Sequence, residues 1–276
     1  MKIIVLGGSG FIGSHLRKAS KTKHEFLFIG RSAADEISTR QFSSREFHTK
    51  VESFQGEVIL DLATHFNLYP SYNDFDKLVE GSLTFHIQMF RELEAYNLPW
   101  VYTSSFWQRR KNENEKAISD YHFLKESIEK YLFQESSAAV VSISLMDTYG
   151  RDDPRKKIVN LLMNLSPNSV PLELSEGNQL LNLLHVEDAA SGLLTACDFA
   201  RWSKENESFD LLAEEFTTLK SLAEQIQVIR NVELPISWGA RPYRPGELFE
   251  VPNNLRPLPS WVANFTLTEG LASLLN

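Results

Sequence analysis

The sequence predicts an α/β protein built on a doubly wound parallel sheet, with a smaller lobe at its C-terminal end. Short apolar runs rich in β-branched residues alternate with segments of helical periodicity through the first 150 residues. This is the pattern of parallel strands joined by helices. The alternation loosens after residue 150, where nine of the 11 prolines lie. A loop-rich lobe is therefore expected there.

The predicted elements follow one another along the chain. The opening run, Lys2 to Leu6, is apolar and β-branched, as expected of a strand that is covered on both faces. The later strands show the same composition, and the helices show apolar residues at helical spacing. Strands are predicted at 2–6, 25–29, 57–63, 99–105 and 139–145, and helices at 14–18, 72–97 and 120–134.

Composition limits the class of protein. The chain has 276 residues, 42% of them hydrophobic and 23% charged, which is ordinary for a globular protein that buries a full core. The net charge of −8 argues against a nucleic-acid or anionic-membrane surface. Cys197 is the single cysteine, so no intrachain disulfide can form. No apolar run reaches about 18 residues, the sequence opens directly on a strand without a signal peptide, and a cytoplasmic location is expected.

A glycine-rich turn joins the first strand to the first helix. Gly7, Gly10 and Gly13 give the pattern G-x-x-G-x-x-G, with Phe11 and Ile12 at the start of the helix. Small residues allow a tight turn and a close backbone approach, and a helix N-terminus attracts a pyrophosphate. These residues are expected to bind a dinucleotide. The alternative is a glycine-rich turn that serves packing alone.

The end of the second strand indicates which dinucleotide is bound. An NAD site usually has an acidic residue there for the ribose hydroxyls, but this chain has Arg31 and Ser32. A guanidinium and a hydroxyl suit a 2′-phosphate, so NADP is expected and NAD is the alternative. Asp35 and Glu36 lie slightly later and would favour NAD if their loop folds back. Arg31 could also be an ordinary surface charge.

Tyr121 and Lys125 form a Tyr-x-x-x-Lys pair on the predicted helix 120–134. Residues four apart share a helix face, and an ammonium beside a phenol favours the phenolate. The pair would then act as a general acid/base in carbonyl–alcohol chemistry. A part-buried tyrosine with a solvated lysine is the alternative.

Four motifs follow one another along the chain. They are Gly7 to Gly13, Thr103-Ser104-Ser105, Tyr121/Lys125 and His185-Val186-Glu187-Asp188-Ala189-Ala190. In this order they resemble the extended short-chain dehydrogenase/reductase family of nucleotide-sugar epimerases, dehydratases and reductases, which has a Rossmann fold. The resemblance implies that Ser105 orients the reacting oxygen, with Ser104 as the second candidate. It also implies that Tyr121 exchanges the proton and that Lys125 lowers its pKa and holds the nicotinamide ribose.

The resemblance also implies a division of labour along the chain. Residues 1–150 are expected to form the dinucleotide-binding domain, with 185–200 returning to it, and 151–276 to form mainly the substrate lobe. The cofactor is expected to contact Asp61, Leu62 and Ala63 as well as the glycine turn. No metal is expected. A homodimer is expected through the helices at 72–97 and 120–134, although their apolar positions could equally face the sheet.

Two local sequences narrow the resemblance. Thr103 to Gln108 and Asp147 to Lys157 are similar to segments of the reductases that make CDP-linked 3,6-dideoxyhexoses, the CDP-paratose and CDP-abequose synthase type. Those enzymes belong to deoxysugar and lipopolysaccharide O-antigen biosynthesis. The substrate implied is a CDP- or dTDP-linked sugar. The sugar nucleotide is expected to contact His65, Trp107, Arg155 and Lys156. The alternatives are that His65 has a structural role and that Arg155 and Lys156 are solvated surface charges.

Absent residues separate the possible reactions. The family's dehydratases carry Asp-Glu directly after the catalytic hydroxyl, whereas this chain has Phe106 and Trp107, so elimination of water is not expected. The helix at 72–97 has Val79 to Ser82 where the family often has an active-site asparagine. The expected reaction is NADPH-dependent reduction of the 4-keto group of CDP-4-keto-3,6-dideoxyglucose. The alternatives are a 4-epimerase with tightly bound NAD and a non-catalytic NADP-binding scaffold.

Overall fold

The central sheet consists of parallel strands in a doubly wound order. The computed structural model describes residues 1–18, 23–31, 35–38, 44–67, 70–109 and 119–275. Within them seven strands pair in the order β11-β6-β5-β4-β1-β2-β3, and each of these pairings is parallel. The chain order reverses between β1 and β4, and in sheets of this kind ligands bind at the carboxyl ends of the strands beside such a reversal.

The strands lie where apolar runs predicted them. Five of the predicted runs are confirmed, with ends that differ by one or two residues. The edge strands β3 and β11 were not predicted. The strands are β1 (Lys2–Leu6), β2 (Glu25–Gly30), β3 (Ile37–Ser38), β4 (Val58–Asp61), β5 (Trp100–Ser105), β6 (Val140–Leu145) and β11 (Glu207–Leu211).

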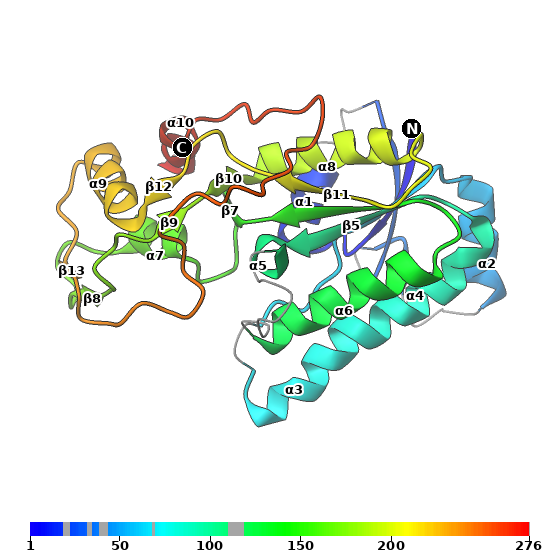
Figure 1. The fold of residues 1–276 in the computed structure, drawn as a ribbon, viewed down its shortest axis with the longest axis horizontal. Helices are drawn as coiled ribbons and strands as arrows, with labels where there is room; N and C mark the ends of the chain where they lie inside the picture. Colours follow the sequence, from blue (N-terminus) through cyan, green and yellow to red (C-terminus); the bar gives the residue numbers. More distant parts are fainter. Residues whose placement is uncertain (19–22, 32–34, 39–43, 68–69, 110–118, 276) are drawn as a thin grey trace.

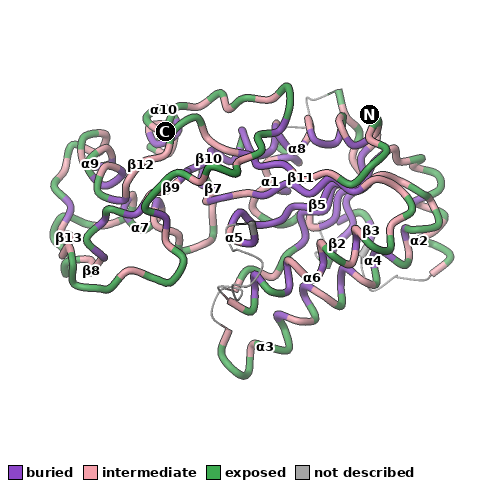
Figure 2. The backbone as a smooth tube through the Cα atoms, viewed as in Figure 1, coloured by how far each residue is buried: buried purple, intermediate pink, exposed green. Residues whose placement is uncertain are grey.

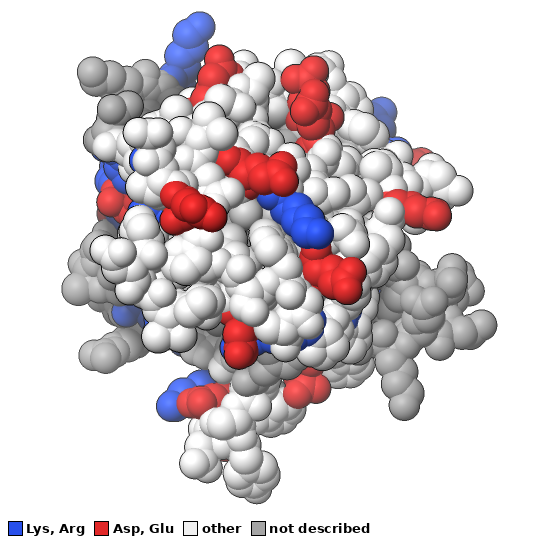
Figure 3. Space-filling view, turned by 90° about the vertical axis from the view of Figure 1, so that its left-hand side faces the viewer, with Lys and Arg blue, Asp and Glu red and all other residues white. Residues whose placement is uncertain are grey.

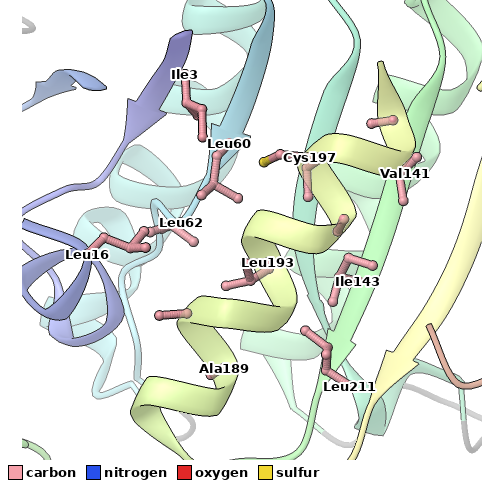
Figure 4. Packing of buried hydrophobic residues seen from close by; sticks show 14 of the residues in the cluster. Ile3, Leu16, Leu60, Leu62, Val141, Ile143, Ala189, Leu193, Cys197 and Leu211 are labelled. Atoms are coloured by element: carbon pink, nitrogen blue, oxygen red, sulfur yellow. The ribbon is translucent and has the colours of Figure 1, made fainter. Parts of the chain in front are cut away.

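Helices cover both faces of this sheet (Figure 1). One face packs against α1 (Phe11–Lys18) and α8 (Val186–Ala200), and the buried residues between them include Ile3, Leu60 and Leu193 (Figure 4). The opposite face packs against α2 (Arg45–Phe54), α4 (Phe85–Leu93) and α6 (Asp120–Glu135). Because both faces are covered, the strands are buried along most of their length (Figure 2).

The predicted helix at 72–97 is one helical path with a widened turn in the middle. It consists of α3 (Tyr72–Val79), a five-residue π-helical segment (Glu80–Thr84), α4 and a short 3₁₀ turn (Glu94–Tyr96). Gly81 lies in the π-helical segment, and a Cβ there would come within 2.9 Å of the His65 Cβ. The glycine therefore allows the loop after β4 to approach the helix closely, and π-helical turns of this kind often occur at functional sites.

The remaining elements form a smaller lobe (Figure 1, left). Its buried core includes Tyr149, Leu162 and Leu222. Short strand pairs connect it to the sheet and brace its loops. The lobe elements are α7 (Ile158–Asn164), α9 (Leu219–Arg230), α10 (Leu267–Ala272) and the pairs β7 (Asp147–Tyr149) with β10 (Leu183–His185), β8 (Leu172–Glu173) with β13 (Ile236–Ser237), and β9 (Leu180–Leu181) with β12 (Thr217–Thr218).

The segment His185 to Ala190 joins the lobe to the sheet. The buried carboxylate of Asp188 accepts hydrogen bonds from the backbone N–H groups of Asn264 and Phe265, both at 3.0 Å. α8 thereby packs on the sheet and also fixes the closing segment of the chain. The division into two domains at residue 150 remains a prediction. Although both elements follow that residue, α8 packs on the sheet and β11 is one of its strands.

The surface is mixed in charge. On the face shown in Figure 3, charged side chains are scattered among uncharged ones, in keeping with a net charge of −8. None of the helices within the described ranges is both long enough and apolar enough to cross a bilayer. The same ranges contain no group of three or more His, Cys, Asp or Glu side chains arranged to hold a metal ion.

Candidate active site

A large cavity opens at the carboxyl ends of the strands. Its volume is about 890 Å³, which is the size of cavities that enclose cofactors and substrates. It extends from the glycine turn, past Tyr121 and Lys125 on α6, to the segment 241–248 of the lobe. The cavity therefore brings the N-terminal glycine turn and the lobe segment 241–248 together beside the reversal point of the sheet.

The glycine turn forms one end of this cavity. Gly7 has a φ of 79°, and a Cβ on it would lie 2.7 Å from the backbone of Ala63. A Cβ on Gly13 would lie 2.6 Å from the Cα of Gly8. Gly7, Gly10, Phe11, Ile12 and Gly13 all line the cavity. The turn thus leads tightly into α1, and its shape fits the dinucleotide that the sequence predicts.

The end of β4 contributes to the cavity wall, and the Asp61 carboxylate lies beneath it. Leu62 and Ala63 line the cavity, but the Asp61 carboxylate is fully buried beneath it. That carboxylate accepts hydrogen bonds from the Ala63 N–H at 3.0 Å and the Trp100 indole at 3.3 Å, and it lies 3.3 Å from His86 Nε2. Asp61 therefore holds the loop in place, and its contact with the coenzyme stays a prediction.

Charged groups of both signs surround the end of β2. Arg31 lines the cavity, and a Cβ on Gly81 would lie 3.3 Å from its guanidinium. Asp35 folds back onto Gly30, at the place that a side chain of residue 30 would occupy, and its carboxylate pairs with Arg17 at 2.5 Å. Ser32, the other predicted phosphate ligand, lies outside the described residues. The sequence analysis favours NAD if the loop that contains Asp35 folds back, and the position of the Asp35 carboxylate meets that condition.

Tyr121 and Lys125 both line the cavity and both are buried. Burial raises the pKa of the Tyr121 phenol, while a hydrogen bond from Thr64 and the charge of Arg155 oppose the rise. The Lys125 ammonium donates to the Thr103 carbonyl and lies 4.4 Å from the Tyr102 ring centre. On balance the pKa of Tyr121 is therefore raised, so the predicted lowering by Lys125 is wrong, and the interactions that oppose the rise are those with Thr64 and Arg155. Burial also lowers the pKa of Lys125 to about 8.

The loop after β4 supplies two contacts that sequence reasoning missed. The Thr64 hydroxyl donates to the Tyr121 oxygen at 3.4 Å, and the Phe66 ring packs edge-on against the Tyr121 ring. Both residues line the cavity. His65, which was the predicted substrate contact, is not a lining residue and packs against Gly81. The only sequence signal for Thr64 and Phe66 is that both residues directly follow the end of a predicted strand.

The two serines at the end of β5 differ in their surroundings. Tyr102 donates its hydroxyl proton to the Lys125 carbonyl, so Tyr102 and, by strand alternation, Ser104 face α6. The Ser104 hydroxyl is buried and has no hydrogen-bond partner among the described residues. Ser105 ends the strand, and its backbone N–H donates to Gln108 Oε1 at 2.7 Å. Both serines line the cavity.

The predicted substrate residues differ in how available they are. Trp107 and Lys156 line the cavity, and Lys156 is exposed. Arg155 also lines it, but its guanidinium holds both oxygens of Asp153, at 2.7 and 2.8 Å, and the Thr148 carbonyl at 2.9 Å. It also lies 4.5 Å from the Phe11 ring centre. Arg155 therefore links the lobe to the glycine turn, and its guanidinium already donates to Asp153 and Thr148 and is not free to bind a diphosphate.

Further lining residues were missed at the lobe end and beside the tyrosine. Arg241, Arg244, Gln179 and Glu247 line the far end, and burial raises the pKa of the Glu247 carboxyl. Their positions in loops gave no sequence signal. His122, the spacer residue of the Tyr-x-x-x-Lys pair, also lines the cavity. Its place directly after Tyr121 was the available clue.

Comparison with known sequences gives the family. Residues 3–211 match the NAD dependent epimerase/dehydratase family. The chain belongs to this family. The match includes the glycine turn, both serines, Tyr121 and Lys125. The chain is thus an NAD(P)-dependent enzyme of a nucleotide-sugar-modifying family within the extended short-chain dehydrogenases/reductases.

Individual relatives are distant but cover nearly the whole chain. CDP-abequose synthase of Yersinia pseudotuberculosis is 24% identical over 254 residues, which are 87% of this chain and 88% of that protein. The solved structure of MoeE5 with UDP-glucose and NAD has a TM-score of 0.80 at 15% identity, over 100% of this chain and 97% of the other. UDP-glucose 4-epimerase of Thermotoga maritima, with UDP-glucose, has a TM-score of 0.79 at 17% identity over the same shares. The structural matches confirm the Rossmann-type fold of this family member.

Proposed function

We propose that the protein reduces the 4-keto group of a nucleoside-diphosphate deoxysugar, with CDP-4-keto-3,6-dideoxyglucose as the substrate that fits best. The observation that carries the proposal is the single cavity in which the glycine turn, Tyr121, Lys125 and Ser105 meet. The sequence segments around Trp107 and 147–157 and the similarity to CDP-abequose synthase support the deoxysugar and the cytidine nucleotide.

The residues around Tyr121 fit the delivery of one proton to a ketone. NADPH, when bound at the glycine turn, would supply the hydride. Tyr121 would donate its proton to the carbonyl oxygen, and Ser105 would hydrogen-bond the same oxygen. Thr64 would stabilise the phenolate left behind, because its hydroxyl already donates to that oxygen. Lys125 would hold the nicotinamide ribose with its ammonium.

The surroundings of Ser105 support reduction over elimination. A dehydratase needs an acid and a base beside the sugar. The two residues after Ser105 are Phe106, which is buried in an apolar cluster, and Trp107. No carboxylate side chain can therefore come from these two positions.

The coenzyme is proposed to be NADPH because Arg31 is a cation on the cavity wall at the end of β2. Asp35, the acidic group nearest to Gly30, already shares its charge with Arg17. Arg31→Ala is expected to weaken NADPH binding at least tenfold and to leave NADH binding nearly unchanged. Equal losses for both coenzymes would argue against recognition of a 2′-phosphate.

A 4-epimerase with tightly bound NAD is the second candidate. The folded-back carboxylate of Asp35 favours it, because a carboxylate at this place suits the hydroxyls of an unphosphorylated ribose. Purified protein would then carry NAD and would interconvert two nucleotide sugars without net consumption of coenzyme.

The direct assay is NADPH oxidation with CDP-4-keto-3,6-dideoxyglucose. The wild type is expected to turn the substrate over, and Tyr121→Phe is expected to reduce kcat about a hundredfold or more because the proton donor is lost. Wild-type activity no higher than that of Tyr121→Phe would eliminate this substrate. NADP binding without activity on any keto-sugar nucleotide would instead support a non-catalytic scaffold.

A further inference from the structure

His122 lies beside the proposed proton donor and has no part in the chemistry described so far. Its side chain is buried, with a residue exposure of 5%, and it lines the cavity together with Tyr121 and Trp107. The ring centres of His122 and Tyr121 are 5.2 Å apart, and those of His122 and Trp107 are 6.4 Å apart. The imidazole therefore forms part of the wall where the sugar must meet Tyr121.

One neighbour fixes the orientation of the imidazole. The Nδ1 atom of His122 and the Ser119 hydroxyl are 2.9 Å apart, within hydrogen-bond distance. Ser119 is the N-cap residue of α6, and its hydroxyl bonds to this ring and not to the helix backbone. Nδ1 is occupied by this hydrogen bond. Among the described residues Nε2 has no such partner, so it is the ring nitrogen left for a ligand.

The His122 imidazole is neutral near pH 7. Burial and the nearby charge of Lys125 lower the pKa of His122 to about 4. A neutral ring presents one donor and one acceptor nitrogen and carries no charge to compete with Lys125. It is therefore suited to a hydrogen bond with an uncharged oxygen and poorly suited to gripping a diphosphate.

We propose that His122 determines sugar specificity by hydrogen-bonding through Nε2 to an oxygen of the sugar, while Trp107 packs beside the same ring. This inference rests on the proposed function, because it requires a nucleotide sugar in the cavity. His122 acts on binding and not on proton transfer. Substitutions at this position change the affinity for the sugar portion and leave the nucleotide portion unaffected.

The test compares a nucleotide with its glucose conjugate, and so does not depend on turnover. Calorimetry measures the dissociation constants of CDP and CDP-glucose, and of UDP and UDP-glucose, in the presence of NADP. His122→Leu is expected to weaken the binding of the glucose conjugate about five- to tenfold and to leave the free nucleotide unchanged. His122→Gln, which keeps a hydrogen-bonding group, is expected to recover most of the loss.

Matched variants separate this role from a structural one. His48 lies on α2 and contacts Tyr96 and Glu92, so His48→Leu is expected to bind all four ligands like the wild type. Ser119→Ala frees the ring and is expected to weaken only the glucose conjugates. Thermal melts and NADP affinity identify any variant that misfolds, and His122→Gln remains informative if His122→Leu does.

Three results overturn the inference, and they can be told apart. If His122→Leu and His122→Gln both bind the glucose conjugates like the wild type, His122 does not contact the sugar. The same holds if free nucleotides and conjugates lose affinity equally. If the wild type binds none of the four ligands, the proposed function fails, and this inference fails with it before any variant is made.

Discussion

The Tyr121 oxygen is controlled by neighbours that lie outside its own helix. Thr64, in the loop after β4, donates to it, and Arg155, from the lobe, contributes positive charge. Lys125, one helical turn away, is directed to the Thr103 carbonyl. We therefore propose that the loop and the lobe adjust the pKa of Tyr121 as the acid/base, and that Lys125 binds the coenzyme ribose.

Thr64→Val is expected to lower kcat about five- to tenfold with little change in KM. The variant keeps the shape of the side chain but removes one hydrogen bond to the oxygen that gains negative charge, which is worth about 1 kcal/mol. Thr64→Ser keeps the hydroxyl and is expected to retain most of the activity. Steady-state kinetics of both variants test this, and a Thr64→Val rate within twofold of the wild type would contradict it.

The binding of NADPH is expected to weaken as the pH rises past about 8. Burial lowers the pKa of Lys125 to that value, so its ammonium persists below pH 8 and is lost above it. The loss of a charge-assisted hydrogen bond to the ribose would raise the dissociation constant about tenfold or more. Fluorescence titrations from pH 6 to 10 measure this dependence, with Lys125→Met as the control that lacks the titrating group. Identical pH dependence in both proteins would assign the effect elsewhere.

We propose that the end of strand β5 presents Ser105 to the substrate. Alternation turns Tyr102 and Ser104 toward α6, and the Ser104 hydroxyl, although Ser104 lines the cavity, is buried without a hydrogen-bond partner among the described residues. Ser105 ends the strand at its open carboxyl edge. Ser105→Ala is therefore expected to reduce kcat about a hundredfold, as the removal of an oxyanion donor does, and Ser104→Ala much less. The reverse order of the two kcat values would assign the role to Ser104.

The helices predicted at 72–97 and 120–134 are found in those positions, but their details were not predictable, and α2, α7, α9 and α10 were not predicted. α6 matches its predicted range within one residue, because its apolar positions repeat at helical spacing. The π-helical turn at Glu80–Thr84 could not be predicted, because it depends on the approach of His65 to Gly81 across the fold. Likewise, Asp61 reads as a ligand at a strand end, and only the positions of Trp100 and His86 show that it is a buried anchor.

The coenzyme end and the lobe end of the cavity differ in how well the sequence predicts them, because the overall fold builds them in different ways. The glycine turn, Ser105 and Tyr121 lie at strand and helix ends and Lys125 lies one helical turn further along α6, so local sequence patterns mark all of them. Gln179, Arg241, Arg244 and Glu247 come from lobe loops that only the folded chain brings to the cavity. Arg155 was predicted to contact the substrate because it lies in a run of basic residues. That run does not reveal that its guanidinium pairs with Asp153 and lies over the Phe11 ring.

A homodimer is proposed through the outer surfaces of α3 and α6. Tyr72, Phe75 and Phe123 are aromatic side chains with 95%, 42% and 59% of their surface exposed on these two helices, which pack together through Leu78 and Leu124. Exposed aromatic groups of this kind are typical of subunit contacts. Phe123→Glu is expected to convert a dimer to a monomer in light-scattering measurements.

Trp202→Glu is the matched control, because Trp202 is 79% exposed just beyond the end of α8. It is expected to leave the dimer intact. A wild-type protein that is monomeric at tens of micromolar, or a Phe123→Glu variant that remains dimeric, would contradict an interface on these helices.

The central claim is that exchangeable NADPH reduces a 4-keto sugar in this cavity, and isotope transfer tests it most directly. NADPH labelled with deuterium at nicotinamide C4, on each face in turn, is incubated with the enzyme and CDP-4-keto-3,6-dideoxyglucose, and the product is examined by mass spectrometry and NMR. We expect one deuterium at the sugar C4, from one face only, with one NADP formed per product. Failure to transfer deuterium to the sugar, by protein that is purified with bound NAD and interconverts two 4-hydroxy nucleotide sugars without consuming NADPH, would contradict the account and identify an epimerase.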